Sequence, residues 1–149
     1  MCGRYSITTP LEAMRHVFRL TGSPKMAPRY NVAPTQTVPA VRQSDGGRHL
    51  VLLRWGLIPS WAKDPKIGAS LINARAETVA SKPAFRSAFA KRRCLVLADG
   101  FYEWQKLPGG KQPWRIILKD GGPFGFAGLW ESWHDPAGQT METCTIITT

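Results

Sequence analysis

Four short turn sequences rich in glycine, proline and aspartate constrain the fold most. They are Asp45-Gly46-Gly47, Pro108-Gly109-Gly110, Asp120-Gly121-Gly122 and Asp135-Pro136-Ala137-Gly138. Each separates two runs rich in apolar and β-branched residues, which is the signal of a β-hairpin. The expected strands are 38–41, 50–55, 95–104, 114–118, 124–130, 130–133 and 142–148. The sequence therefore predicts an α+β fold, a mainly antiparallel, barrel-like meander with a few short helices.

Two helices are expected beside the strands. Thr9-Pro10-Leu11-Glu12 has the spacing of a capping box with proline at the first helical position, and Gly22 would end this helix. Residues 84–91 repeat apolar residues at helical spacing and predict a second, shorter helix. With 149 residues and no linker composition, we expect a single domain over residues 1–149.

The charge is high and uneven. Twenty Lys and Arg residues against ten Asp and Glu give a net charge of +10, and residues 1–93 hold sixteen of the basic and four of the acidic residues. Such a field favours a polyanion, most often nucleic acid, although a solubility surface is the plainer alternative. The sequence has no apolar run of membrane length and no secretory signal, so we expect a cytoplasmic, nucleoid-associated protein and no membrane partner.

Metals and cofactors are not expected. The three cysteines lack Cys-x-x-Cys spacing, which argues against both a disulfide framework and a zinc site. The three histidines, His16, His49 and His134, have no ligand partner at metal spacing. Phosphate-loop and dinucleotide fingerprints are also missing from the sequence.

Cys2 is the sharpest candidate for chemistry. Removal of Met1 would give it a free α-amine and a thiol on adjacent carbons, which titrate near ~7.7–8.0 and ~8.5. An aldehyde would form an imine at the amine, and the thiol would then close a five-membered thiazolidine ring. A chance cysteine on a frayed terminus is the plainer alternative. Cys94 and Cys144 are expected to be small core residues.

Glu103, Asn73, Arg75 and Trp61 are further candidates. Glu103 stands between two aromatic residues, where desolvation would raise its pKa and suit acid–base work. Asn73, Arg75 and Glu77 would share one face of a strand, so that the amide binds a reacting group and the guanidinium a phosphate. An exposed strand glutamate and a weak surface Arg–Glu pair are the alternatives. Trp61 is the tryptophan most suited to stacking on an unpaired base.

Several motifs, in order, resemble the SOS-response-associated peptidase (SRAP) family. They are Met1-Cys2-Gly3-Arg4-Tyr5, Tyr30-Asn31-Val32-Ala33-Pro34-Thr35, Arg54-Trp55-Gly56-Leu57-Ile58-Pro59-Ser60-Trp61, Ile72-Asn73-Ala74-Arg75-Ala76-Glu77-Thr78 and Ala98-Asp99-Gly100-Phe101-Tyr102-Glu103-Trp104. Phe126-Ala127-Gly128-Leu129-Trp130-Glu131 and Thr145-Ile146-Ile147-Thr148-Thr149 are similar to later stretches of the same family. The resemblance covers the whole chain.

The resemblance implies an enzyme that captures abasic sites in single-stranded DNA as a thiazolidine, with an associated self-processing peptidase or lyase activity. Cys2 would be the nucleophile, Asn73 would hold the sugar and the N-terminus, and Glu103 would shuttle protons. The implied DNA contacts are Arg4, Asn31, Trp61, Arg75 and Arg86. No cofactor is implied.

The family pattern continues past Thr148-Thr149 into a catalytic histidine and another apolar strand, whereas this sequence ends there. We therefore expect a form shortened at its C-terminal side that is prone to self-association.

Two other function classes remain open at this stage. An N-terminal-nucleophile glutamine amidotransferase also begins with Cys-Gly, and there the amine acts as the base for the thiol. A non-catalytic single-strand-binding module would use the basic charge alone.

Overall fold

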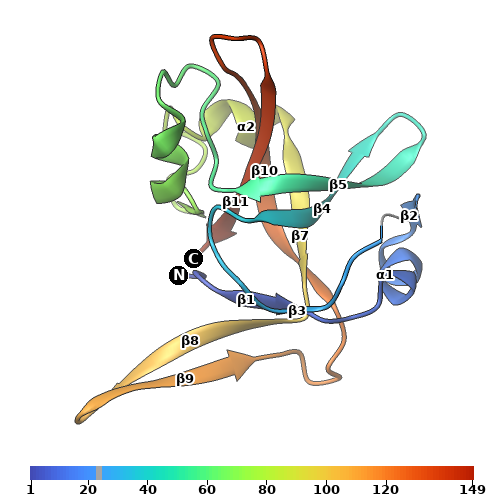
Figure 1. The fold of residues 1–149 in the computed structure, drawn as a ribbon, viewed down its shortest axis with the longest axis vertical. Coiled ribbons are helices and arrows are strands. Elements are labelled where there is room, and N and C mark those ends of the chain that lie inside the picture. Colours follow the sequence, from blue (N-terminus) through green and yellow to red (C-terminus); the bar gives the residue numbers. More distant parts are fainter. Residues whose placement is uncertain (23–24) are drawn as a thin grey trace.

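The computed structural model describes residues 1–22 and 25–149. These residues form two sheets and a few short helices, which confirms the expected α+β class (Figure 1). The smaller sheet has the strand order β3 (Arg29–Val32), β1 (Tyr5–Ile7), β8 (Gly100–Leu107) and β9 (Gly110–Ile116). The helical elements are α1 (Leu11–Phe18), the 3-10 helix η1 (Pro65–Ser70) and α2 (Arg86–Lys91).

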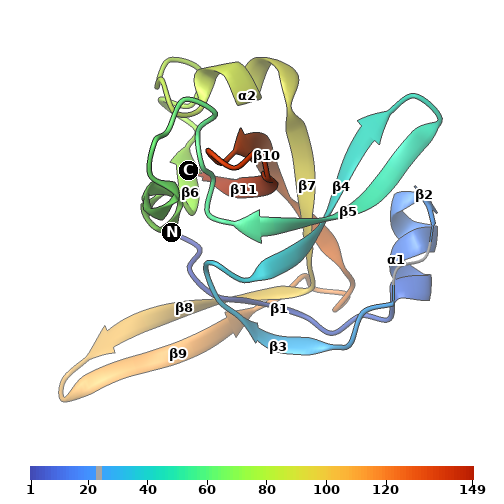
Figure 2. The same cartoon turned by 45° about the horizontal axis from the view of Figure 1, so that its top comes forward.

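The larger sheet closes on itself. Its strand order is β2 (Leu20–Thr21), β5 (Gly47–Trp55), β4 (Thr37–Ser44), β7 (Arg93–Ala98), β10 (Phe124–His134), β11 (Thr140–Thr148) and β6 (Asn73–Arg75). A further pairing joins β5 to β11, so β5, β4, β7, β10 and β11 form a closed ring. Figure 2 shows this ring with α2 above it and the β8–β9 hairpin extending away from it.

Three of the four predicted hairpins are confirmed within the expected barrel-like, mainly antiparallel architecture, but the strands are not ordered as a meander. The turns at 45–46, 108–109 and 136–138 join β4 to β5, β8 to β9 and β10 to β11. Residues 120–122 instead carry the chain from β9 in one sheet to β10 in the other. Parallel pairings of β2 with β5 and of β11 with both β5 and β6 also depart from a meander.

The expected strand 95–104 is two strands, because Asp99 breaks it. β7 belongs to the larger sheet and β8 to the smaller one. Between them the Asp99 carboxylate accepts hydrogen bonds from Ser6 Oγ at 2.8 Å, from Thr8 N at 2.6 Å and from Thr9 N at 2.7 Å. Arg115 Nη2 donates at 3.2 Å to Oδ1, the oxygen that also accepts from Ser6. This cluster fixes the point where the chain crosses from sheet to sheet.

The same cluster explains why the predicted capping box does not form. The Thr9 hydroxyl donates to Asp99 at 2.9 Å instead of capping α1, whose N-cap is Pro10 without a side-chain hydrogen bond. The helix also ends earlier than expected, at Arg19 in the left-handed conformation and not at Gly22. The second helix begins at Arg86, two residues after the predicted start.

Apolar side chains fill two clusters. The main one lies within the ring and against β1, and includes Tyr5, Trp55, Val96 and Cys144. The Tyr5 ring packs against Trp55 at 5.3 Å and against Phe126 at 5.7 Å between centroids. The second cluster lies under α2 and includes Leu57, Phe85 and Leu129. Among the described residues, no helix combines the length and the apolar character that a membrane crossing requires.

Asp99→Asn is expected to destabilise the protein by about 2–3 kcal/mol, since an amide leaves some of these donors unpaired. Burial opposes ionisation of Asp99, but the hydrogen bonds from Thr8, Ser6 and Thr9 outweigh it and hold the pKa of this carboxyl well below its usual value of 3.8. Its stabilisation is therefore fully present above about pH 4 and is lost as the pH falls toward the depressed value. Denaturant unfolding at neutral and acidic pH measures both effects.

Asp120→Asn is the matched control, because that carboxylate accepts one hydrogen bond, from Gly122 N, in an exposed turn. It is expected to change the free energy of unfolding by less than about 0.5 kcal/mol. Equal stability of Asp99→Asn and Asp120→Asn would contradict the structural role of Asp99.

Candidate functional site

The N-terminus lies against β8, beside Glu103. Strand β1 sits between β3 and β8, with Tyr5 opposite Phe101 and the Tyr102 amide donating to the Arg4 carbonyl at 3.0 Å. Extended in this register, the chain brings the Met1 α-amine to 3.6 Å from Glu103 Oε1. Both views of the fold place the N-terminus next to the C-terminus, where β6 pairs with the end of β11 (Figures 1 and 2).

Cys2 is buried although it is the second residue of the chain. Its side chain is 5% exposed and belongs to the main apolar cluster, with Sγ 3.9 Å from the Arg4 carbonyl. Burial raises the pKa of the Cys2 thiol to about 11, and the nearby charge of Glu103 adds to the rise. The frayed-terminus alternative is therefore wrong: the thiol is held in place and protonated at neutral pH.

Alkylation of the folded, Met1-bearing protein by iodoacetamide is expected to be slow at every cysteine. The pKa of Cys2 rises from 9.0 to about 11, which lowers its thiolate fraction at about pH 8 roughly hundredfold. Burial also raises the pKa of Cys94 to about 12 and that of Cys144 well above its usual value. Intact mass over time measures the rate, and protein unfolded in guanidinium is the control. Rapid single labelling of the native protein would refute the buried placement.

Glu103 is positioned differently from the expectation. Its side chain is 45% exposed, so the predicted desolvation between Tyr102 and Trp104 is wrong. Alternate residues of a strand point to opposite faces, so both aromatic side chains lie on the other face of β8. On its own face Glu103 stands opposite Trp114 of β9, whose indole Nε1 donates to Gln105 at 2.9 Å. The carboxylate thus faces the chain terminus with access to solvent.

Asn73 begins β6, the strand beside the C-terminal end of β11. Its Nδ2 donates to the Ile72 carbonyl at 3.1 Å and to the Ile146 carbonyl at 3.5 Å. Its Oδ1 is buried and has no hydrogen-bond donor among the described residues. A buried acceptor without a donor is costly, so this oxygen is available to a ligand or to an amine at the terminus.

Arg75 lies two residues further on the same strand and is exposed. Its Nε is 3.7 Å from Glu77 Oε2, a weak surface pair of the kind that the plainer alternative predicted. β6 ends at Arg75, however, and Glu77 stands in the following turn, so the expected continuation of the strand to Glu77 is wrong. The guanidinium keeps most of its donors free for an anion.

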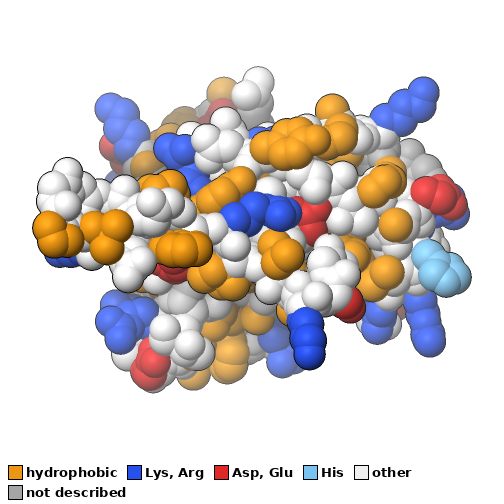
Figure 3. Space-filling model, turned by 90° about the horizontal axis from the view of Figure 1, so that it is seen from below, with side chains coloured by type: hydrophobic (Ala, Val, Ile, Leu, Met, Phe, Trp, Pro, Cys, Tyr) orange, Lys and Arg blue, Asp and Glu red, His pale blue; other side chains and the backbone are white. Residues whose placement is uncertain are grey.

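Arg4 and Asn31 come together on the smaller sheet. Arg4 Nη1 donates to Asn31 Oδ1 at 3.1 Å. Near them, the Tyr102 hydroxyl donates to the Tyr30 carbonyl at 2.6 Å, and the Tyr102 and Trp104 rings lie 6.4 Å apart. Figure 3, which views the molecule from below, shows apolar side chains among lysines and arginines on this side. Tyr30 and Trp104 are exposed and Tyr102 is half-buried, and none of the three is a candidate from the sequence.

Trp61 is 60% exposed on a loop that hydrogen bonds join to β10 and β11. The buried Trp133 indole donates to the Ala62 carbonyl at 2.7 Å, and the Ile58 amide donates to Thr143 Oγ1 at 2.9 Å. Gly56 and Gly68 cross at their backbones, since a Cβ on Gly56 would lie 2.5 Å from the Gly68 oxygen. An exposed indole on a fixed loop is a suitable stacking platform.

Arg86 lies in the helix above the ring, apart from the N-terminus (Figure 2). It opens α2, which packs over the ring, and its side chain makes no hydrogen bond or ion pair in the part of the chain that the structure describes. Across those same residues, no group of three or more His, Cys, Asp or Glu side chains is arranged to hold a metal ion.

Known proteins resemble this chain in both sequence and fold. Residues 1–149 match the profile of the SOS response associated peptidase (SRAP) family. The abasic site processing protein YoqW of Bacillus subtilis is 46% identical over 153 residues, spanning 100% of this chain and 68% of that protein. The abasic site processing protein HMCES of Mus musculus is 30% identical, and the match covers 99% of this chain and 56% of that protein. A crystal structure from Bacteroides thetaiotaomicron superposes with a TM-score of 0.89 at 28% identity, over 98% of this chain and 67% of that one.

Proposed function

Because the chain belongs to the SOS response associated peptidase (SRAP) family, we propose that it processes abasic sites in DNA by capturing them covalently at Cys2. The relatives named for abasic site processing support the substrate. The observation that carries the proposal for this chain is the Met1 α-amine 3.6 Å from Glu103 Oε1, next to the buried Cys2 thiol. Removal of Met1 transfers the terminal amine to Cys2, so that an amine, a thiol and a nearby carboxylate, the groups that thiazolidine formation needs, would meet at this end of the chain.

The first step is removal of Met1. With Met1 attached, the Cys2 nitrogen is an amide and cannot attack a carbonyl. Hydrolysis of the Met1–Cys2 peptide bond consumes one water, releases methionine and leaves a free amine on Cys2. Glu103 is the nearest carboxylate to this end of the chain and is our proposed acid–base group for the step.

The second step joins protein and DNA. The Cys2 amine adds to the aldehyde carbon of the ring-opened abasic sugar, and loss of water gives an imine. Cys2 Sγ then adds to the imine carbon while the thiol proton passes to the nitrogen, which closes the thiazolidine. Glu103 is proposed to donate and accept the protons, and the unpaired Oδ1 of Asn73 to accept a hydrogen bond from the amine or a sugar hydroxyl.

DNA is proposed to lie across the residues around this end of the chain. Arg4 and Arg75 would pair with phosphates, Asn31 would orient Arg4, and Trp61 would stack on a base. Arg86 would contact the DNA strand only where that strand extends away from Cys2. A flexible single strand exposes the sugar, so single-stranded DNA is the proposed form of the substrate. The proposed location of the protein is the nucleoid.

The test is intact-mass spectrometry of protein incubated with an oligonucleotide that carries one abasic site. The expected product has the mass of the Met1-free protein plus the oligonucleotide minus one water. An undamaged oligonucleotide of the same sequence is the control, and a duplex form tests the strand preference. Glutamine hydrolysis without any DNA adduct would favour an amidotransferase and overturn the proposal.

Trp61→Ala is expected to weaken single-stranded DNA binding by about 1–3 kcal/mol, the usual value of one base stacked on an aromatic side chain. Trp61→Phe keeps a stacking ring and should retain most of the affinity. Fluorescence anisotropy with a labelled oligonucleotide at fixed salt measures both, since salt alone changes such affinities strongly. Unchanged binding by Trp61→Ala would place the DNA elsewhere.

A further inference from the structure

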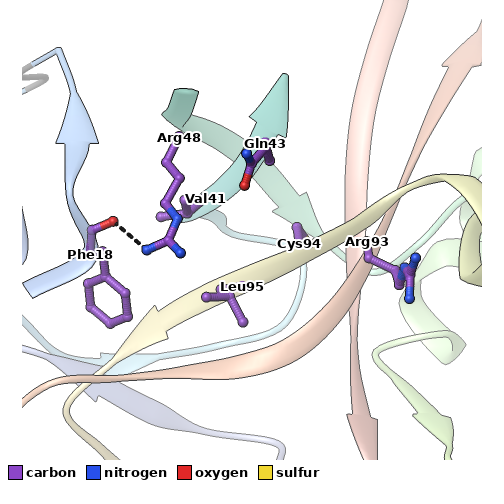
Figure 4. Close-up of a pocket in the computed structure, with 7 residues that line it drawn as sticks. All are labelled: Phe18, Val41, Gln43, Arg48, Arg93, Cys94 and Leu95. Carbon is purple, nitrogen blue, oxygen red and sulfur yellow. Dashed lines mark hydrogen bonds between the residues drawn. The ribbon is translucent and has the colours of Figure 1, made fainter. Parts of the chain in front are cut away.

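A cavity opens where two strands of the ring part. In the described chain, β4 and β7 pair at Ala40–Val96 and Val41–Leu95 and then diverge, so the β4–β5 hairpin leans away from β7 (Figure 2). The cavity at this fork has a volume of about 240 Å³. Its apolar lining comes from Phe18, Val41 and Leu95, and its polar lining from Gln43, Arg48 and Arg93. Figure 4 shows Arg48 and Arg93 on opposite sides of Leu95.

The two arginines leave positive charge without a counter-ion at this cavity. Arg48 Nη1 donates to the Phe18 carbonyl at 3.1 Å, which fixes the guanidinium but does not neutralise it (Figure 4). Neither Arg48 nor Arg93 has a carboxylate partner among residues 1–22 and 25–149. Guanidinium groups bind carboxylates and phosphates most strongly, so the cavity suits an anionic ligand.

The volume and the lining decide between classes of anion. Pockets for drug-sized ligands usually hold about 300–1,000 Å³, so this cavity suits one apolar side chain. A nucleic-acid strand would bring phosphates to the arginines, but each base carries polar edges that Val41 and Leu95 would leave without hydrogen-bond partners. A peptide with an apolar anchor and neighbouring carboxylates satisfies both the slot and the charges.

We propose that this fork is a docking site for an acidic peptide segment of a partner protein that ends in an apolar residue. The apolar side chain would enter the fork between Phe18 and Leu95, and carboxylates would pair with Arg48 and Arg93. The fork lies at the α1 and β4–β5 side, away from the N-terminus (Figures 1 and 2). A partner can therefore bind here while the Cys2 region holds DNA.

The test uses a fluorescein-labelled peptide with three aspartates followed by a C-terminal phenylalanine with a free carboxylate. Saturable binding is expected in fluorescence anisotropy. Arg93→Glu and Leu95→Gln should each weaken it by about tenfold or more, because one reverses a charge and the other makes the slot polar. Both side chains are at the surface, with Leu95 38% exposed, so the fold should tolerate these changes.

Lys106→Glu is the matched control: it makes the same charge change on β8, far from the fork, and should alter binding less than about twofold. Equal weakening by Lys106→Glu and Arg93→Glu would show nonspecific charge attraction and overturn the proposal. Replacement of the phenylalanine by serine should abolish binding, and unchanged affinity would also overturn it. So would an Arg93→Glu protein that keeps its peptide affinity but loses affinity for undamaged single-stranded DNA.

Discussion

Cys2→Ala is expected to abolish the covalent adduct with abasic DNA. Alanine keeps the free amine after Met1 removal, so an imine can still form, but no thiol is present to close the ring. An imine hydrolyses readily, and the heat-stable product should therefore fall below detection. Denaturing gel electrophoresis after heating, with intact mass as the second readout, measures the effect.

Cys94→Ala is the matched control, because it removes an equally buried thiol from β7 without touching the N-terminus. Its adduct should form at the parent rate. A heat-stable adduct in Cys2→Ala would move the nucleophile elsewhere and refute the mechanism.

Retention of Met1 should have the same effect as loss of the thiol. The adduct yield is expected to follow the fraction of molecules that lack Met1, since the Cys2 amide nitrogen is not nucleophilic. Preparations with different degrees of Met1 removal, quantified by mass, test this directly. Equal yields from processed and fully unprocessed protein would exclude the amine from the reaction.

Local turn chemistry predicted the hairpins, and long-range contacts decided the rest. The β4–β5 turn fits because Gly46 adopts a φ of +91°, which glycine reaches without strain. Residues 120–122 have the same composition but join different sheets, and a turn sequence does not reveal which strand its neighbours pair with. The role of Asp99 could not be predicted for a similar reason: its partners Ser6, Thr8 and Thr9 lie 90 to 93 positions away in sequence.

In the candidate site, too, the sequence predicted the local features and the long-range contacts could not be predicted. The order of the motifs predicted the family, and the match over the whole chain confirms it. The sequence also made Cys2 and Glu103 candidate site residues, but it did not predict that β1 inserts between β3 and β8 and so brings the N-terminus to Glu103. The desolvation expected for Glu103 overlooked strand alternation, which turns Tyr102 and Trp104 to the opposite face. No local sequence pattern indicated that Trp133 donates a hydrogen bond to the loop that carries Trp61.

The position of Glu103 determines what its replacement should do. The carboxylate is 45% exposed, and among the described residues its ion-pair partner is the Met1 α-amine at 3.6 Å, which is lost with Met1. Glu103→Gln keeps the size and can still accept a hydrogen bond, but it cannot exchange a proton. Stability and affinity for undamaged single-stranded DNA should therefore change little.

The rate of adduct formation by Glu103→Gln should fall by roughly 10²–10⁴, the range that general acid–base catalysis supplies. Single-turnover kinetics with Met1-free protein isolates this step from peptide hydrolysis, because a variant that retains its methionine would also react slowly. Glu12→Gln, on α1 and away from the N-terminus, is the control and should react at the parent rate. The terminal amine and the thiol are both intact in Glu103→Gln, so the final yield should approach that of the parent while the rate does not. A Glu103→Gln protein that reacts at full speed would show that solvent, and not this carboxylate, carries the protons.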